Sequence, residues 1–443
     1  MQLIDHWMMF GTFAEQRHFI YPSVASYAGA VINANMAAHA PDGLAAFLVE
    51  KTSGLAYIID PMTHAWQHEP MFVCDAEGNP KKALSTLAQN YGEPYKSALG
   101  RRPLTPDDFR DQALHRESVE RVITFQKNRL SLAMASTDAM RYLEATDKEL
   151  RPRALVSPYF YLHEVNLQYW LPIMLQAVEY ALPMADGIPV YGGVVIGKGL
   201  LQSEKLRKQL TTALLSASLD GYVVWVDGLQ EQEASASELC ALLELCRSLR
   251  INGSRYILNL HGGYFSVLAA GELGNNALNG VTHAPEFGEA RSVVPIGGGI
   301  PIARYYVPEL HSRVRYRDAQ AMFKAKGWLD SASSFFQNVC DCEECRKVLK
   351  DSAENFILFG EGKVKEVKRG QGIARMEYPT PETKLRCLRH YLQRKQMEHD
   401  FVSRQPKEIQ LQELTSSKDK YIDVLGFDGI KHLVIWKQVF EAN

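Results

Sequence analysis

The stretch "IPVYGGVVIGKGLLQSEKLRKQLTTALLSASLDGYVVWVDG" (residues 188–228) decides the expected fold, because two strand patterns flank one helix pattern. Residues 188–197 and 221–228 are apolar runs rich in valine and bounded by glycine, which is typical of buried strands. Residues 203–219 place apolar side chains at three- and four-residue spacing, which is typical of one face of a helix. This order predicts a parallel βαβ unit.

The same alternation extends over most of the chain. Further strand patterns lie at residues 45–50, 55–60, 153–162, 255–263, 279–285 and 302–310. Helix patterns at residues 163–182 and 235–251 separate some of them. Strands that alternate with helices predict an α/β fold with a parallel sheet. Polar or glycine-rich residues follow the strand patterns, as at the active-site end of a (β/α)8 TIM-like barrel, so we expect that barrel, with a doubly wound sheet as the alternative.

Two regions depart from this alternation. Residues 84–150 contain helix patterns without a clear strand, which predicts a helical insertion after an early strand. The alternation ends near residue 316. We therefore expect a barrel with its insertion over residues 1–316 and a C-terminal subdomain over residues 317–443.

The composition excludes several classes of protein. A hydrophobic content of 46% with 23% charged residues is that of a soluble globular chain rather than a disordered one. A net charge of −2 gives no support for nucleic-acid binding by the whole surface, so such binding would need a local basic patch. We find no secretory signal and no apolar run of the roughly 18 residues that a membrane span needs. A cytoplasmic protein without membrane contact is expected.

The segment "NVCDCEECRKVL" (residues 338–349) holds three of the seven cysteines, Cys340, Cys342 and Cys345. In a reducing compartment such a cluster indicates a metal site rather than disulfides. Three thiolates supply most of a tetrahedral Zn²⁺ site, and a site closed by four protein ligands is structural. Cys387 and His390 lie on adjacent turns of one face of a later helix pattern, and either could be the fourth ligand.

A barrel followed by "CDCEEC" (340–345) and "LRHYLQRKQMEHD" (388–400) resembles the tRNA-guanine transglycosylase superfamily, and most of all its DNA-guanine transglycosylases. The resemblance covers about residues 45–402, although the "DSGGF" and "FDC" segments of the tRNA enzymes are absent. It implies that His390 completes the zinc site. It also implies replacement of guanine in DNA by a 7-deazaguanine such as 7-cyano-7-deazaguanine, with an ATPase-type partner. The alternatives are a tRNA-directed enzyme or a catalytically inactive binding subunit, and a homodimer is possible in each case.

Base exchange of this kind needs two carboxylates, a nucleophile that attacks C1′ and an acid/base that serves the departing and incoming bases. Asp60 ends the strand pattern "LAYIID", in a position that resembles that of the family's general acid/base. Asp227 ends "YVVWV" and is the expected nucleophile. Glu286, within "GVTHAPEFGE" (280–289), is the alternative nucleophile, because this segment corresponds to the family's nucleophile segment. An aspartate at a strand end also often only forms a turn or a cap.

Two groups of residues are candidates for substrate binding. Glycine pairs let a flat purine approach the backbone closely, although they are also common in turns. The expected base-binding residues are Gly192, Gly193, His261, Gly262, Gly263 and His283. The expected phosphate-binding residues are Lys365, Lys368, Arg369, Arg389 and Arg394, with a solvated helix face as the alternative. A base inside duplex DNA must be flipped out or presented on a single strand.

Overall fold

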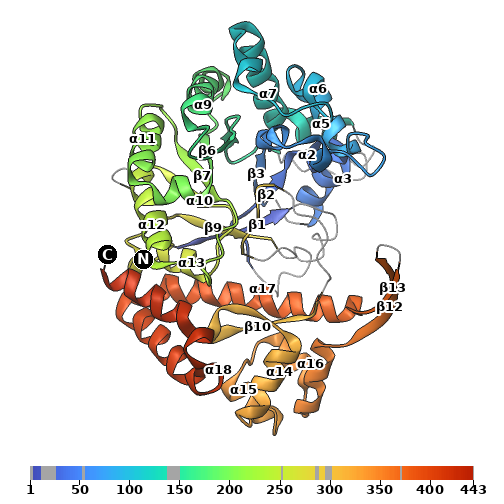
Figure 1. The fold of residues 1–443 in the computed structure, drawn as a ribbon, viewed down its shortest axis with the longest axis vertical. Helices are drawn as coiled ribbons and strands as arrows, with labels where there is room; N and C mark the ends of the chain where they lie inside the picture. The colour runs from blue at the N-terminus through green and yellow to red at the C-terminus, as the bar shows by residue number, and fades with distance from the viewer. Residues whose placement is uncertain are drawn as a thin grey trace.

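The computed structural model describes residues 3–10, 26–51, 55–136, 150–250, 253–284, 289–294, 302–369 and 372–442. Its centre is a parallel barrel of eight strand positions (Figure 1). The strands are β1 (Asp5–Phe10), β2 (Gly29–Asn33), β3 (Ala56–Asp60), β4 (Leu155–Val156), β5 (Tyr161–Leu162), β6 (Val190–Ile196), β7 (Gly221–Val226), β8 (Tyr256–Asn259) and β9 (Gly280–His283). Both β4 and β5 pair with β6 and together fill one position of the barrel. The expected (β/α)8 architecture is therefore confirmed.

The barrel closes between β3 and β4. The strand order is β3-β2-β1-β9-β8-β7-β6-β4, and every neighbouring pair in it is parallel. A parallel bridge between Ile58 and Ala154 joins the two ends of this order. The amide of Arg153 also donates a 2.8 Å hydrogen bond to the carbonyl of Tyr57. These contacts are fewer than in a full strand ladder, so the barrel is nearly closed.

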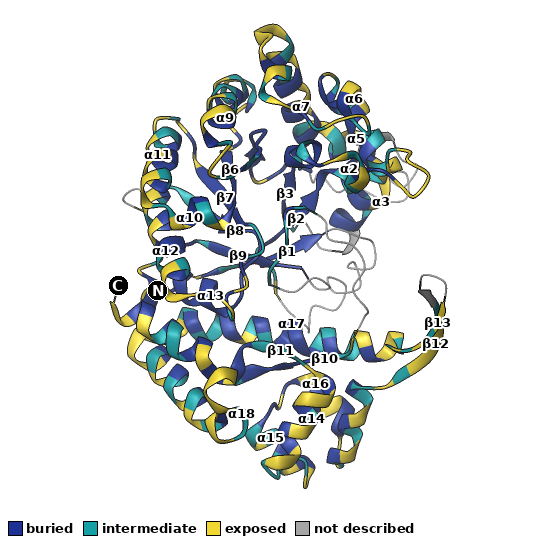
Figure 2. Cartoon of the chain, in the orientation of Figure 1, coloured by how far each residue is buried: buried dark blue, intermediate teal, exposed yellow. Residues whose placement is uncertain are grey.

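The strands form because they are covered on both faces. Every residue of β6 and β7 is buried, and Figure 2 shows the barrel strands mostly in the buried colour. Parallel strands covered on both sides read as continuous apolar runs, which explains why residues 188–197 and 221–228 were recognisable. The helices on the outside of the barrel are α2 (Ala34–His39), α3 (Pro41–Ala46), α9 (Leu167–Ala181), α10 (Lys198–Gln202), α11 (Glu204–Leu215), α12 (Ala236–Arg250) and α13 (Tyr264–Ala270). Short helical turns are η2 (Phe47–Lys51), η5 (Leu182–Met184) and η6 (Glu272–Gly274).

Two strand predictions were wrong. Residues 45–50 are helical, in α3 and the following π-helical turn η2, because this short apolar run packs as one side of a helix beside α7. Residues 302–310 contain β10 (Arg304–Val307), which pairs antiparallel with β11 (Ser312–Arg315) outside the barrel. The first two barrel strands are instead β1 and β2, which the sequence patterns missed.

The insertion between β3 and β4 is mostly helical over its described residues, and one antiparallel bridge joins Cys74 to Pro80. Its elements are η3 (Thr63–Gln67), α4 (Pro70–Val73), α5 (Lys82–Tyr91), α6 (Tyr95–Ala98), η4 (Pro106–Phe109) and α7 (Gln112–Ser136). In this part α7 packs on α3, α5 and α9. The insertion therefore stands beside the carboxyl end of β3, where it can supply one wall of a site.

The C-terminal part packs on the barrel through its last two helices. Its elements are η7 (Pro308–Leu310), α14 (Tyr316–Ala325), α15 (Ala332–Asn338), α16 (Glu343–Leu349), η8 (Ala353–Phe359), β12 (Gly362–Arg369), β13 (Gly372–Pro379), α17 (Pro381–Arg404) and α18 (Lys407–Ala442). Helix α17 lies between the barrel and the β10–α16 region (Figure 1), and α18 packs on α12 and η6. Gln396 of α17 lies 3.2 Å from the ring of His6 in β1, which ties this helix to the first barrel strand. Within the described residues, no helix is both long and apolar enough to cross a bilayer.

Candidate functional site

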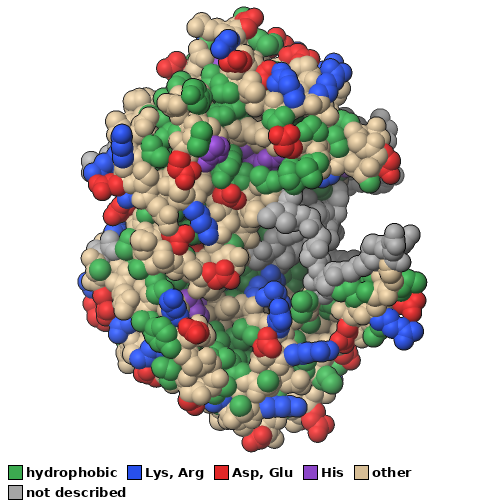
Figure 3. All heavy atoms as spheres, in the orientation of Figure 1, with side chains coloured by type: hydrophobic (Ala, Val, Ile, Leu, Met, Phe, Trp, Pro, Cys, Tyr) green, Lys and Arg blue, Asp and Glu red, His purple; other side chains and the backbone are tan. Residues whose placement is uncertain are grey.

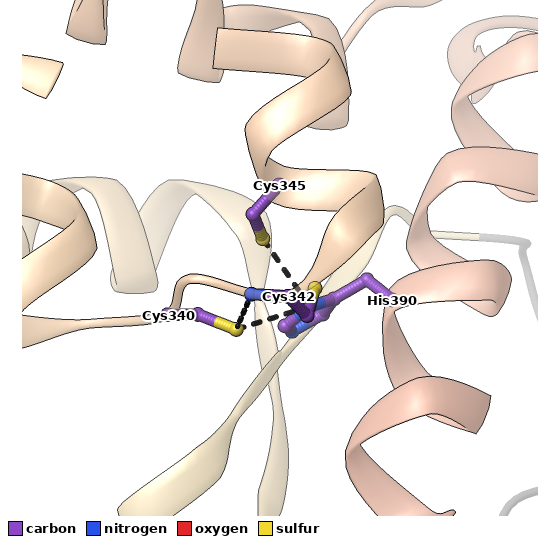
Figure 4. A group of neighbouring side chains, drawn as sticks. All are labelled: Cys340, Cys342, Cys345 and His390. Carbon is purple, nitrogen blue, oxygen red and sulfur yellow. Dashed lines mark hydrogen bonds between the residues drawn. The ribbon is translucent and has the colours of Figure 1, made fainter. Parts of the chain in front are cut away.

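The three clustered cysteines meet His390 at the junction of α16 and α17. Cys340 and Cys342 precede α16, Cys345 lies in its first turn, and His390 projects from α17 (Figure 4). All four residues are buried, and their ligand atoms lie within 4.8 Å of one another. Cys340 and His390, which are 50 positions apart in the sequence, therefore lie in one group. The group could hold a metal ion.

The distances within this group fit a tetrahedral metal site. His390 Nδ1 lies 3.3 Å from the Sγ of Cys342, 3.4 Å from that of Cys345 and 3.8 Å from that of Cys340. Ordinary Zn–S and Zn–N bond lengths in a tetrahedron place nitrogen and sulfur about 3.6 Å apart. His390 Nε2 lies 2.7 Å from the carbonyl oxygen of Tyr306, which fixes the proton on Nε2 and leaves the Nδ1 lone pair for a metal.

Cys387, the other candidate for the fourth position, does not join this group. Its Sγ donates a 3.3 Å hydrogen bond to the carbonyl oxygen of Phe359. Burial raises the pKa of the Cys387 thiol to about 12, so it is a neutral thiol near physiological pH. The alternative all-cysteine site is therefore excluded by the geometry, and the prediction of His390 is confirmed as the fourth member of the group.

A second site lies at the mouth of the barrel, where a cavity of about 190 Å³ opens beside the carboxyl ends of the strands. Its walls include Met9, Asn33, Asn35, Asp60, His64, His68, Phe72, Leu84, Trp225, His261, Arg291 and Val293. These residues come from β1, β2, β3 and β7, from the segments after β8 and β9, and from the helical insertion. The volume lies below the roughly 300–1,000 Å³ of pockets for drug-sized ligands. It suits a ligand the size of one planar heterocycle.

Asp60 is the only carboxylate among the described residues that line this cavity. Its side chain is 5% exposed, and its Oδ1 accepts hydrogen bonds from the Tyr159 hydroxyl at 2.5 Å and from the Met62 amide at 3.0 Å. Burial raises the pKa of Asp60, although both hydrogen bonds and the charge of Arg291 act in the opposite direction. A carboxyl group in this setting holds its proton more readily than an exposed one, which is what a general acid requires.

His64 extends the hydrogen-bonded chain that begins at Asp60. Its Nδ1 lies 3.1 Å from the Tyr159 hydroxyl, and the two rings are stacked. Because that hydroxyl donates its proton to Asp60, it accepts one from His64. Burial, together with nearby His68 and Arg291, lowers the pKa of His64 well below its usual value. His64 and Tyr159 are therefore uncharged donors. His64 donates to the Tyr159 hydroxyl, which in turn donates to the carboxyl group of Asp60.

Asp227 directly follows β7, is half-buried and is not among the described residues that line the cavity. Its Oδ1 accepts a 2.7 Å hydrogen bond from the amide of Val293, which lines the cavity, and its Oδ2 accepts a 3.0 Å bond from the Tyr161 hydroxyl. The carbonyl oxygen of Arg291 accepts further hydrogen bonds from the amide of Gly228 and the indole of Trp225. Asp227 thus helps to hold residues 291–293 over the end of β7. The third candidate, Glu286, lies outside the described residues.

The glycines serve packing in this structure. A Cβ atom at Gly193 would lie 2.3 Å from the ring of Tyr159, and one at Gly192 would lie 2.9 Å from Leu219. The other pair, Gly262 and Gly263, likewise has no room for a side chain. A Cβ at Gly262 would meet Val281 at 2.5 Å, and one at Gly263 would meet the carboxylates of Glu231 and Glu289 at 2.6 Å. None of the four is among the described residues of the cavity wall.

The two candidate histidines, His261 and His283, lie in different environments. His261 lines the cavity, and its ring lies 4.8 Å from that of Trp225. His283, at the end of β9, is fully buried and stacks on His6, with its Nε2 3.5 Å from that of His6. Its ring also contacts Tyr391 of α17 edge-on. His283 therefore belongs to the contact between the barrel and α17.

A buried charge network at that contact was missed by the sequence reasoning. Lys395 of α17 is 1% exposed, pairs with Glu289 and lies 2.8 Å from Glu398. His311 lies 2.7 Å from Glu398 and 3.0 Å from Glu413 of α18. Burial alone would raise the pKa of Glu398, but Lys395 and His311 lower it to about 2. The three-residue spacing of Lys395 and Glu398 on a helix pattern is a signal of their pairing that could have been used.

The expected phosphate-binding residues lie in two places. Lys365 is exposed on β12, while Arg389 and Arg394 are half-buried on α17. The side chains of Lys368 and Arg369 lie outside the described ones. Figure 3 shows a hollow between the β12–β13 hairpin and the barrel, with Lys and Arg side chains near α17. Among the described candidates, only Lys365 is exposed.

No protein-family model matches the sequence, and no curated protein matches it.

Proposed function

We propose that this chain is a base-exchange transglycosylase that replaces guanine in DNA with a 7-deazaguanine such as 7-cyano-7-deazaguanine. The observation that carries the proposal is Asp60, a buried carboxyl group with a raised pKa in a base-sized cavity at the mouth of a (β/α)8 barrel. The Cys340–Cys342–Cys345–His390 group supports it as well, because its place after the barrel is the feature on which the family resemblance rests.

The reaction would proceed as a double displacement. Asp227 attacks C1′ of the target nucleotide to form a covalent aspartyl-nucleotide, and the bond from C1′ to guanine breaks as Asp60 gives its proton to the departing base. The incoming 7-deazaguanine then loses a proton to Asp60 and displaces Asp227 from C1′. Oδ2 of Asp227 must leave the Tyr161 hydroxyl before it attacks. Glu286 is the alternative nucleophile.

We further propose that the metal is Zn²⁺ and that its role is structural. Three thiolates and one imidazole are a preferred donor set for zinc, and four protein ligands leave no position for a substrate or water. The ion would join α16 to α17, since Cys345 and His390 lie on these two helices. Because α17 also contacts β1, zinc would stabilise the packing of the C-terminal part on the barrel.

Nucleoside mass spectrometry tests the proposed function. The chain is incubated with 7-cyano-7-deazaguanine and either DNA or tRNA, with and without a co-expressed ATPase-type partner. The proposal predicts the modified deoxynucleoside in digested DNA and free guanine in solution. Modification of tRNA alone would support the tRNA-directed alternative. No exchange into either polymer under both conditions would support an inactive binding subunit.

A further inference from the structure

His261 is a buried side chain in the cavity whose hydrogen-bonding capacity is not fully used. It is 7% exposed, and within the described part of the chain its Nδ1 is buried without a hydrogen-bond partner. His64, in the same cavity, does have one, the hydroxyl of Tyr159. The Oδ1 of Asn35, on the β2 side of the cavity, is likewise buried without a partner in the described structure.

The backbone holds His261 firmly in this position. The amide of Leu260, just before it, donates a 2.8 Å hydrogen bond to the carbonyl oxygen of Val224. The amide of Gly262, just after it, donates a 2.9 Å hydrogen bond to the carbonyl oxygen of Thr282. The imidazole also packs on Trp225. The backbone bonds fix residues 260–262 between β7 and β9, and the contact with Trp225 orients the imidazole ring.

A buried polar group without a partner destabilises the folded state, and in natural proteins such groups usually have a reason. Here two of them line one cavity together with Asp60, which points to a ligand that supplies the missing partners. The charge of Arg291 lies close enough to lower the pKa of both His261 and His64, so the cavity disfavours a cationic ligand.

We infer that His261 hydrogen-bonds the edge of the base in this cavity and that Asn35 Oδ1 accepts a hydrogen bond from an N–H group of the same base. The inference rests on the proposed function and specifies its ligand as an uncharged planar heterocycle with both donors and acceptors on its rim, as in guanine. Burial and Arg291 lower the pKa of His261 to about 3, so the ring is neutral at physiological pH and offers one N–H donor and one lone pair.

Base binding by two variants of His261 tests this assignment. His261→Phe keeps a flat ring without nitrogen, while His261→Asn keeps a polar group at about the position of Nδ1. Binding of radiolabelled guanine and of 7-cyano-7-deazaguanine is measured by equilibrium dialysis with the full chain. We expect affinity to fall about tenfold or more in His261→Phe, the value of one lost hydrogen bond, and to stay within about threefold in His261→Asn. Wild-type affinity in His261→Phe, or equal losses in both variants, would overturn the inference.

A measurement on the unaltered protein covers the case in which His261→Phe does not fold. In wild-type protein labelled with ¹⁵N-histidine, the Nδ1 resonance that is missing in His261→Asn should shift when guanine is added. An unmoved resonance at saturating base overturns the inference. Failure of the inference can be distinguished from failure of the proposed function. Base binding that depends on His261 without any exchange contradicts only the reaction, and exchange with no effect of His261 contradicts only the inference.

Discussion

The hydroxyl of Tyr159 donates a 2.5 Å hydrogen bond to Oδ1 of Asp60, so a residue from the β4–β5 region orients the carboxyl group at the end of β3. The ring of Tyr159 occupies the space above Gly193 of β6, where any side chain would collide with it. The absence of a side chain at position 193 is therefore a condition for the arrangement of the cavity.

Gly193→Ala should displace Tyr159 and loosen Asp60. Because the new methyl group would overlap the Tyr159 ring, we expect a loss of about 1–3 kcal/mol in the free energy of unfolding, together with slower base exchange. Tyr159→Phe is the matched variant, since it removes only the hydroxyl and should reduce exchange at a smaller cost in stability. Urea denaturation and an exchange assay measure both effects. Wild-type stability in Gly193→Ala would show that the ring is not confined as described.

The metal group predicts one zinc ion per chain. Cys342→Ser should lose that ion, and its C-terminal part should unfold at lower urea concentration, because metal binding and folding are coupled at such sites. Cys387→Ser is the control, since Cys387 lies on the same helix as His390 but bonds to Phe359 instead. Elemental analysis by mass spectrometry gives the zinc content of each protein. Full zinc content in Cys342→Ser, or loss in Cys387→Ser, would contradict the assigned ligand set.

The His311 pairs predict a loss of stability at alkaline pH. Burial alone would lower the pKa of His311, but Glu413 and Glu398 raise it to about 9. A raised pKa means that the stabilisation is complete below the unfolded value of about 6.5 and is lost as the pH rises through about 9. His311→Asn removes the charge and tolerates the left-handed backbone at this position, where φ is 46°. Between about pH 7 and pH 10, wild-type protein should lose roughly 1–3 kcal/mol more than the variant in urea titrations. Parallel pH profiles of the two proteins would be evidence against a charged His311.

DNA binding should depend on the lysines of the exposed hairpin. Each lysine that contacts a phosphate of single-stranded DNA contributes about 0.7 to the slope of log affinity against log salt concentration. Lys363 and Lys365 are both exposed on β12. Replacing them by alanine should therefore lower the slope by about 1.4 and weaken binding of single-stranded DNA of any sequence. Lys208→Ala on α11, where Lys208 pairs with Glu204, is the control and should leave the slope unchanged. An unchanged slope in the double variant would remove the hairpin from the DNA-binding surface.

The parts of the fold that could be predicted were those with strong local patterns. Strands β6 and β7 are buried on both faces and read as unbroken apolar runs, so their βαβ unit was found. Residues 45–50 form an equally apolar run but pack as a helix, since short runs of this kind do not distinguish the two structures. Strand β2 was missed although it is as long as β3, because helix α2 follows it at once and no glycine or proline marks its end.

The candidate site could likewise be predicted only in part. The cysteine spacing predicted three members of the metal group, and the family resemblance selected His390 over Cys387. Nothing local to His261 reveals that its Nδ1 lacks a partner, because that property arises only when β7, β8 and β9 are placed side by side. The packing role of Gly193 likewise depends on Tyr159, which is distant in sequence.

Single-turnover base exchange with Asp60→Asn tests the central claim most directly. Wild-type protein, Asp60→Asn and the surface control Asp423→Asn, whose exposed carboxylate pairs with Lys326, are each mixed in excess with DNA and 7-cyano-7-deazaguanine. The account predicts that wild type and Asp423→Asn release guanine and modify the DNA at similar rates, whereas Asp60→Asn is slower by roughly 10²–10⁴-fold, as expected on loss of a general acid/base. Exchange by Asp60→Asn at the wild-type rate would contradict it.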